Sequence, residues 1–425
     1  MMTAGQRTRV LDELRAFASA RGRSALVLVS GDVYCSDFPA EPDRTVMHLT
    51  GFSVGGAMLV VTAGSATAFA IQPFAEQAAR EIDPALGVSY QASDVVPVAD
   101  WLAARLPRGA RVGLETERRS RTFLEAARAR LELAGVRLED VSGAEIDALT
   151  GRPAAQRAPI DLHPARWSGA SCEEKRQRVA QELHRAGLSA MLVNGLSSVA
   201  WLFNIRGRDL GGPNVTSTPV CKARALVMAD GRAALFCDLD KLPAGAAEHF
   251  GDGVTLHREH ELHALARAMA GPSAVVGMDP DRTNDVLARA LEDVGLAPRW
   301  MSDPIADLKA VKHAAEQDGA REAFLHASAS LIEMLVEIYD DRDGPRALRE
   351  FGVRRRLAEL HARSPDYMME SFPAIVAGGP RAALLNYISS TLCGAPRCGA
   401  HNGSFIMGWA MGSARASTCT KRRSR

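Results

Sequence analysis

Features that would place a protein in a membrane or outside the cell are missing from this sequence. No apolar run reaches the length of about 20 residues that a helix needs to cross a bilayer. The first residues, MMTAGQRTRVLDELRAF, follow the pattern of an amphipathic helix and lack the apolar core of a signal peptide. We therefore expect a cytoplasmic protein without a membrane partner.

Cysteine pairs and an excess of one charge are also absent. The seven cysteines form no C-x-x-C pair and no zinc-ligand spacing. Four are scattered, as suits buried or free thiols in a reducing compartment, and three crowd into the tail: Cys35, Cys172, Cys221 and Cys237, then Cys393, Cys398 and Cys419. The formal net charge of +1 argues against nucleic acid as a partner.

The C-terminal part of the chain lacks carboxylates. From Ser371 to Arg425 there is no Asp and no Glu, and His401 is the only histidine. Hard divalent ions such as manganese prefer carboxylate oxygen ligands, and a two-metal site needs several of them. One histidine without carboxylates cannot build such a site in this part of the chain.

The 425 residues are too many for one ordinary domain. Apolar, β-branched runs alternate with helical patterns from residue 1 to 150, which predicts an α/β domain there. The expected helices are Val10–Ala20, Asp94–Leu106 and Arg121–Ala134, and the expected strands are Ser24–Tyr34, Met47–Phe52, Gly56–Thr62, Ala66–Ile71 and Arg111–Glu115.

A linker rich in proline and small residues, 151–164, leads to a second domain over residues 165–302. The order of helix, turn, apolar strand and loop occurs again in this domain. The aligned segments are Arg21–Val33 with Arg185–Ser198, Leu49–Phe52 with Leu202–Gly207, and Gly56–Ile71 with the strands Ala223–Ala229 and Ala233–Asp238. Two copies of one α/β unit are the simplest explanation.

A third region begins at Asp303-Pro304, a turn pattern that precedes a helix. One amphipathic helix is expected from there to Glu322, and a second helical stretch at Arg346–Arg363. The expected apolar face consists of Ile305, Leu308 and Val311, continued by Phe324, Ile332 and Leu335.

Four stretches carry a family resemblance: LTGF (Leu49–Phe52), WLFNIRGRD (Trp201–Asp209), LKAVKHAAEQDGAREA (ending at Ala323) and SFPAIVAGGPRAALLNY (Ser371–Tyr387). They closely resemble segments of the aminopeptidase P family, metallopeptidases of the creatinase, or pita-bread, superfamily. The resemblance implies two tandem creatinase-like α/β domains. They would be followed by an incomplete pita-bread (α+β) catalytic domain over residues 303–387 and an aberrant basic tail over residues 388–425.

The resemblance also implies a chemistry. Intact relatives would bind two manganese ions, act on peptides with proline at the second position, and form a homodimer. Their ligands, two aspartates, a histidine and two glutamates, lie beyond Tyr387 and have no match here, so no metal is expected to bind this chain.

The resemblance places three residues near the substrate pocket: Arg206, Asp209 and Asn386. Asn386 occupies the position of the family's histidine, and an amide cannot carry a proton as an imidazole does. Arg381 stands in place of the family's asparagine. Arg206 and Asp209 either form a structural ion pair, which we favour, or border the active site.

Two functions remain open. The chain resembles a metal-dependent Xaa-Pro aminopeptidase that is inactive as it stands, or it is a non-catalytic scaffold that dimerises or binds a partner. For the tail, a shifted reading frame or truncated gene is preferred over a genuine short paralogue. A nucleic-acid-binding KRRSR motif is the least favoured interpretation.

Overall fold

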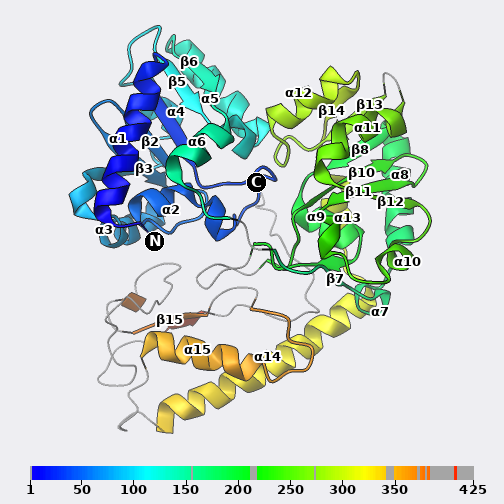
Figure 1. The fold of residues 1–425 in the computed structure, drawn as a ribbon. Coiled ribbons are helices and arrows are strands. Elements are labelled where there is room, and N and C mark those ends of the chain that lie inside the picture. Colours follow the sequence, from blue (N-terminus) through cyan, green and yellow to red (C-terminus); the bar gives the residue numbers. More distant parts are fainter. Residues whose placement is uncertain are drawn as a thin grey trace.

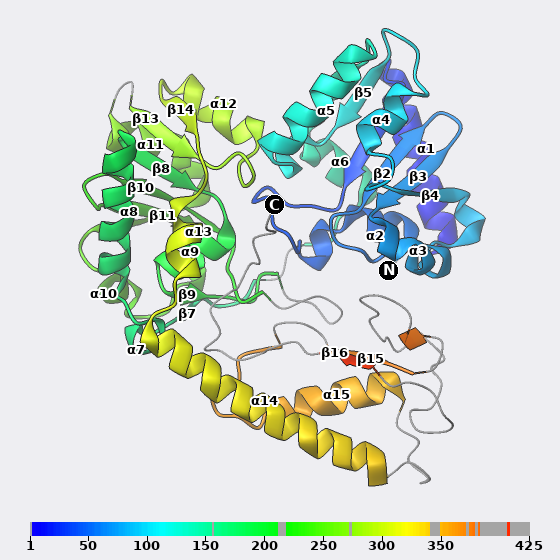
Figure 2. The ribbon, with the colours of Figure 1, turned by 180° about the vertical axis from the view of Figure 1, so that it is seen from behind.

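The computed structural model describes residues 2–154, 157–210, 218–271, 274–340, 349–370, 374–378, 381–382 and 406–408. Two α/β domains lie next to each other, and a third, mainly helical region extends from the second (Figures 1 and 2). No helix in these ranges is both long and apolar enough to cross a membrane.

The first domain is built on a six-stranded sheet with the order β4-β3-β2-β1-β5-β6. Its strands are β1 (Ala25–Val29), β2 (Met58–Thr62), β3 (Ala66–Ala70), β4 (Val88–Ala92), β5 (Arg111–Leu114) and β6 (Arg137–Asp140). Its helices are α1 (Ala4–Ala20), α2 (Thr45–Thr50), α3 (Ala75–Glu81), α4 (Val98–Ala103), α5 (Arg121–Leu133) and α6 (Gly143–Thr150). β1 pairs antiparallel with β2 and parallel with β5, so it is a central strand.

Both faces of β1 are buried, which explains its unbroken apolar sequence. Leu26 and Leu28 belong to the core that contains Leu14 of α1. Val27 and Val29 point the other way, toward a core that contains Leu124 of α5.

The second domain repeats this sheet in the order β12-β11-β10-β8-β13-β14. Its strands are β8 (Ala190–Val193), β10 (Ala223–Met228), β11 (Ala233–Cys237), β12 (Val254–His257), β13 (Val275–Met278) and β14 (Ala297–Trp300). Its helices are α7 (Ala165–Ser168), α8 (Cys172–Ala186), α9 (Leu196–Leu202), α10 (Ala246–Phe250), α11 (Leu262–Ala270) and α12 (Asp285–Asp293), and β7 (Asp161–Leu162) pairs with β9 (Ile205–Arg206). Corresponding strands run in the same relative directions as in the first sheet, which confirms the predicted repeat of one α/β fold.

The third region contains α13 (Pro304–Ala310), α14 (Ala314–Asp340), α15 (Glu350–His361) and an antiparallel pair of short strands, β15 (Ile375–Ala377) and β16 (Ile406–Gly408). Met334 of α14 packs with Val353 and Leu357 of α15 and with Val376 of β15 in a small core. The 3₁₀ helices of the chain are short and lie mostly in loops: η1 (Glu41–Asp43), η2 (Gln72–Phe74), η3 (Pro84–Leu86), η4 (Thr116–Arg118), η5 (Leu239–Lys241) and η6 (Glu259–Glu261).

One expected strand is a helix. Met47–Phe52 overlaps α2, which buries Val46 and Leu49 on one side and ends at Gly51, where φ is +88°. Glycine adopts this left-handed conformation without steric strain, so it ends the helix here. The aligned segment at Leu202 is also the end of a helix, α9.

The single helix expected over Asp303–Glu322 is wrong as well. Helix α13 ends at Ala310, and α14 begins at Ala314. Val311 lies in the break and is 77% exposed, whereas Ile305 is buried. Phe324, Ile332 and Leu335 are also exposed, so the predicted apolar face does not form one continuous buried surface.

Two other predicted helices are shorter than their sequence pattern. Within Asp94–Leu106 only α4 is helical, and it begins after Pro97, which occupies the N-cap position. In the stretch Arg346–Arg363 the structure has α15, and residues 341–348 lie outside the described ranges.

Candidate functional site

The segment that resembles the family's catalytic pocket is held to α15 by one buried carboxylate. Glu350, fully buried at the start of α15, accepts a hydrogen bond of 2.7 Å from the backbone N–H of Gly378. Its other oxygen lies 3.0 Å from Nη1 of Arg381. Arg381, at the family's asparagine position, therefore helps to fix the chain after β15. Asn386 and most of the stretch Ser371–Tyr387 lie outside the described residues.

The acidic residues of the third region do not fit a two-metal site. Several form ion pairs with arginines of α15 or the residues after it: Glu337 with Arg356 at 2.7 Å and Glu333 with Arg363 at 2.8 Å. Glu370, the last carboxylate in the sequence, is half-buried, and burial raises its pKa while Arg354 lowers it. Within the described ranges, no group of three or more His, Cys, Asp or Glu side chains could hold a metal ion. No catalytic step through metal ions can be built on these residues.

Arg206, in the short strand β9 of the second domain, is buried. Its Nη1 donates to the backbone oxygens of Ala200 (3.1 Å) and Ile205 (2.8 Å). Burial lowers the pKa of Arg206 to about 10, opposed by the nearby carboxylate of Glu316 in α14. Arg206 thus stabilises the end of α9 and lies near Glu316 in the first turn of α14.

Lys175 shares this environment. It is fully buried, and its Nζ donates to the backbone oxygen of Trp201 at 3.0 Å and to Oδ1 of Asn204 at 2.5 Å. Burial, and then the charge of Arg206, lower the pKa of Lys175 to about 8. The same causes lower the pKa of His163 to about 3. A buried positive cluster therefore underlies the WLFNIRGRD segment, and Glu316 is the carboxylate near it.

Asp209 does not pair with Arg206, so the expected ion pair between them is wrong. Both oxygens of the buried Asp209 side chain accept hydrogen bonds from Nζ of Lys241, and Oδ2 also accepts from the backbone N–H of Lys222 at 2.7 Å. Arg206 and Asp209, three residues apart, thus bind different partners: Arg206 donates to backbone oxygens, and Asp209 pairs with Lys241.

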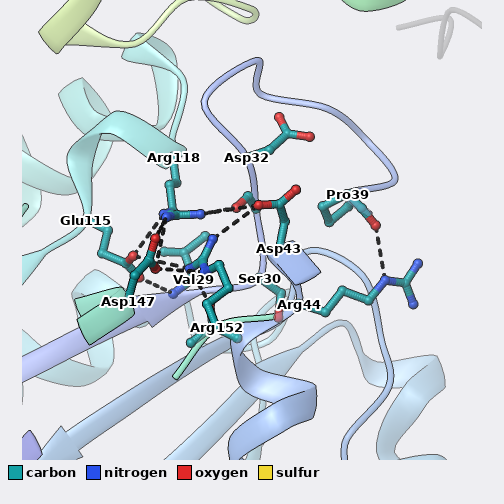
Figure 3. Close-up of polar contacts among 12 residues, drawn as sticks. Val29, Ser30, Asp32, Pro39, Asp43, Arg44, Glu115, Arg118, Asp147 and Arg152 are labelled. Carbon is teal, nitrogen blue, oxygen red and sulfur yellow. Dashed lines mark hydrogen bonds and ion pairs between the residues drawn. The ribbon is translucent and has the colours of Figure 1, made fainter. Parts of the chain in front are cut away.

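A dense group of buried charges, built mainly by residues of the first α/β domain and by Arg152 of the linker, was not found from the sequence (Figure 3). Asp43 of the first domain accepts a hydrogen bond of 2.8 Å from Nζ of Lys222 in the second. Arg152 and Arg118 also approach Asp43, at 3.2 and 3.6 Å. Nothing in the sequence pattern indicated this group, because its members come from distant positions and lie next to no recognisable motif.

Glu115 is the most buried member of this group. Its Oε1 lies 2.9 Å from Nε of Arg118, but the two atoms are not aligned for a hydrogen bond. Burial raises the pKa of Glu115 to about 7, although the charge of Arg118 lowers it.

The loop after β1 extends this contact between the domains. The backbone oxygen of Val33 accepts hydrogen bonds from side chains of the second domain at 3.2 to 3.4 Å: Asn194, Arg224 and Asn284. The Tyr34 hydroxyl donates to Glu259, and the Arg224 guanidinium lies 4.4 Å from the centre of the Tyr34 ring. Burial raises the pKa of Tyr34 well above its usual value. The two domains are thus joined by many specific polar contacts.

The cysteines with described surroundings are free thiols, as expected: Cys172, Cys221 and Cys237 are buried and Cys35 is half-buried. Burial raises the pKa of Cys35 and Cys221 to about 12, so neither is an activated nucleophile.

Two family models match the chain, at residues 11–149 and 151–316, and both are described as the creatinase/prolidase N-terminal domain. The probable Xaa-Pro aminopeptidase P of Coccidioides posadasii (strain RMSCC 757 / Silveira) is 27% identical over 392 residues, covering 89% of this chain and 62% of the relative. That of Pyricularia oryzae (strain 70-15) is 27% identical over 395 residues, covering 89% and 63%. The chain thus spans about three fifths of the length of these relatives.

A solved structure has the same fold. The X-prolyl aminopeptidase of Caenorhabditis elegans, described as a cytosolic enzyme with a di-nuclear active site, superposes with a TM-score of 0.84 at 24% identity. The superposition covers 96% of this chain and 67% of that protein. With two creatinase/prolidase N-terminal domains in tandem, the chain belongs to the aminopeptidase P family of the creatinase, or pita-bread, superfamily.

Proposed function

We propose that this chain is of Xaa-Pro aminopeptidase lineage but does not hydrolyse peptides as its sequence stands. The observation that carries the proposal is the absence of Asp and Glu from Ser371 to Arg425, together with the engaged carboxylates of α14 and α15. In this lineage, substrates are peptides with proline at the second position, and a pair of metal ions, manganese in our proposal, activates water. The two α/β domains supply the scaffold beside which such a site is built.

The proposed limits of the parts are residues 1–150, a linker over 151–164, 165–302, 303–387 and a basic tail over 388–425. The proposed location is the cytoplasm, where the C. elegans neighbour is described as acting. The second candidate function is a non-catalytic α/β scaffold that dimerises or binds a partner, built on two domains that are held together by buried polar contacts.

The test is a peptidase assay of the chain purified from a host that lacks aminopeptidase P. We expect no release of the N-terminal residue from an Xaa-Pro peptide with added manganese, and less than one metal ion per chain by elemental analysis. Circular dichroism of the same sample shows whether the protein is folded. Manganese-dependent turnover by a folded sample would overturn the proposal.

A second measurement tests whether the gene encodes an active enzyme even if this polypeptide is inactive. The encoding DNA is read in the other two frames beyond Tyr387. A carboxylate-rich continuation would restore the enzyme function for the gene, and the chain extended with it should then hydrolyse the same peptide.

A further inference from the structure

A serine of the second domain and a lysine of the third region form a hydrogen-bonded pair where α9 meets α13. Nζ of Lys309 in α13 lies 2.8 Å from Oγ of Ser197 in the first turn of α9. Lys309 is only 4% exposed, whereas Ser197 is half-buried. The two helices lie side by side in both views (Figures 1 and 2), so packing of elements far apart in the sequence fixes the pair.

The pair lies near the carboxyl end of a central strand of the second sheet. Only Asn194 and Gly195 separate β8 from α9, and β8 runs parallel to its neighbour β13. In open α/β sheets, ligands bind in the crevice outside the carboxyl ends of the strands. The position of Ser197 directly after β8 is therefore one at which such sheets carry functional groups.

The amine of Lys309 is buried beside a neutral hydroxyl and not beside a counterion. Asp303, the nearby carboxylate, accepts hydrogen bonds from the Ser198 hydroxyl and from the backbone N–H of Ile305 at 2.8 Å. Among the residues that the structure describes, no carboxylate lies at salt-bridge distance from Lys309. A buried ammonium without a counterion is costly, so this environment favours the uncharged amine.

The protonation of Lys309 follows from these surroundings. Burial is the largest effect, and it lowers the pKa of Lys309 to about 8. The charges nearby act in both directions, since the pKa is raised by Asp303 and Asp37 and lowered by Arg282 and Lys312. Around pH 8, about half of the molecules thus carry an uncharged amine at this position. In those molecules the Ser197 hydroxyl is the donor of the hydrogen bond to Nζ.

We propose that Ser197 is a nucleophile activated by Lys309 and that the chain hydrolyses small activated esters at this hydroxyl. Nζ of Lys309 takes the proton of the hydroxyl while Oγ forms a bond to the ester carbonyl carbon. The bond from that carbon to the leaving alkoxide then breaks, and Lys309 returns the proton to the alkoxide. Water attacks the acyl-serine with Lys309 as base, which releases the carboxylic acid and restores Ser197.

The surroundings of Ser197 limit the substrate. Arg282 packs against the turn before α9, where a Cβ added at Gly195 would lie 3.6 Å from Cγ of Arg282. The same Arg282 pairs with Asp37 of the first domain at 3.0 Å, so a contact between the two α/β domains lies next to this turn. A half-buried hydroxyl in such a place admits a small acyl group. An ester with a good leaving group fits best, because its departure needs little assistance from an acid.

The test is covalent labelling of the full chain with a small fluorophosphonate, which phosphonylates an activated serine and displaces fluoride. Intact mass spectrometry is expected to show one adduct per chain, and peptide mapping should place it on Ser197. The labelling rate should rise with pH and level off above an apparent pKa of about 8, that of Lys309. Release of nitrophenolate from p-nitrophenyl acetate should follow the same profile. Both assays contain EDTA, so a negative result leaves the proposal on peptide hydrolysis untouched.

Four variants separate the roles of the two residues. Ser197→Ala should abolish the adduct, whereas Ser65→Ala, at an exposed serine in the turn between β2 and β3, is the control that should keep it. Lys309→Met should slow labelling at pH 8 by roughly 100-fold or more, because the base is lost. Lys309→Arg should slow it as strongly, since a guanidinium keeps the positive charge but does not accept a proton.

Three results would overturn the proposal. They are a folded wild-type chain that stays unlabelled at pH 9, an adduct that survives Ser197→Ala, and a labelling rate that folded Lys309→Met or Lys309→Arg leaves unchanged. Circular dichroism and thermal unfolding establish that each variant is folded. If both lysine variants unfold, the pH profile of the wild-type chain decides, because labelling without a step near pH 8 excludes Lys309 as the base.

Discussion

Nζ of Lys222 in the second α/β domain lies 2.8 Å from Oδ2 of Asp43 in the first. The Asp43 side chain is mostly buried and is also approached by Arg152 and Arg118. This contact ties the two copies of the repeated fold together, although neither sheet needs it for its own core.

Lys222→Met should weaken the contact between the domains. The apolar stem remains, but Asp43 loses one of three cationic neighbours, and we expect a loss of about 1 to 2 kcal/mol in the free energy of unfolding. Urea unfolding measures this loss. Arg232→Met, which breaks an exposed pair with Asp230, is the control and should change the stability by less than about 0.5 kcal/mol. Equal effects of the two substitutions would show that Lys222 has no special role.

The stability of the protein should depend on pH through Glu115. Burial raises the pKa of this carboxyl from 4.5 to about 7 in the folded state. The folded protein then binds a proton that the unfolded chain has released, so this contribution is full below pH 4.5 and is lost as the pH rises through 7.

Glu115→Gln replaces the carboxyl that binds this proton by an amide that does not titrate. The wild-type protein should lose on the order of 1 to 3 kcal/mol more stability than the variant between pH 5 and pH 8. Urea unfolding at both pH values measures the difference. Parallel pH profiles for the two proteins would contradict the raised pKa.

Gly169 should fix the start of α14. Its φ is +76°, and a Cβ added there would lie 2.4 Å from Cβ of His313, in the break before α14. Gly169→Ala should therefore combine left-handed strain with a steric clash, at a cost of about 2 to 5 kcal/mol.

The matched control is Gly187→Ala at the end of α8. Its φ is +65°, and no neighbouring atom lies within 4 Å of the added Cβ, so only the strain of about 1 to 2 kcal/mol applies. Thermal unfolding compares the two variants. If both lose the same stability, the contact between Gly169 and His313 does not position α14.

Arg381→Asn places the family's residue at this position but removes the guanidinium that lies 3.0 Å from Oε2 of Glu350. Because the Glu350 carboxylate is fully buried, we expect a loss of about 1 to 3 kcal/mol and faster hydrogen exchange in α15. Arg363→Asn, in an exposed pair with Glu333, should have a much smaller effect. Unchanged exchange in α15 after Arg381→Asn would exclude this bracing role.

The sequence by itself determined the repeated α/β fold and the family. Apolar runs such as β1 require burial on both faces, and their recurrence after α8 shows that one unit occurs twice. The sequence also determined the chemistry that the chain lacks, because metal ligands need carboxylates and none follows Glu370.

Only the tertiary structure decided where short elements end and which distant charges meet. The segment from Met47 to Thr50 is helical, with Leu49 in the core, and Gly51 ends the helix in a left-handed conformation. From the sequence alone, a short apolar run of this kind cannot be distinguished from a strand. Asp209 meets Lys241 rather than Arg206, and Asp43 meets Lys222, because packing of separate segments brings these groups together. Periodicity records which face of an element is buried, but it carries no information on which remote side chain will lie against that face.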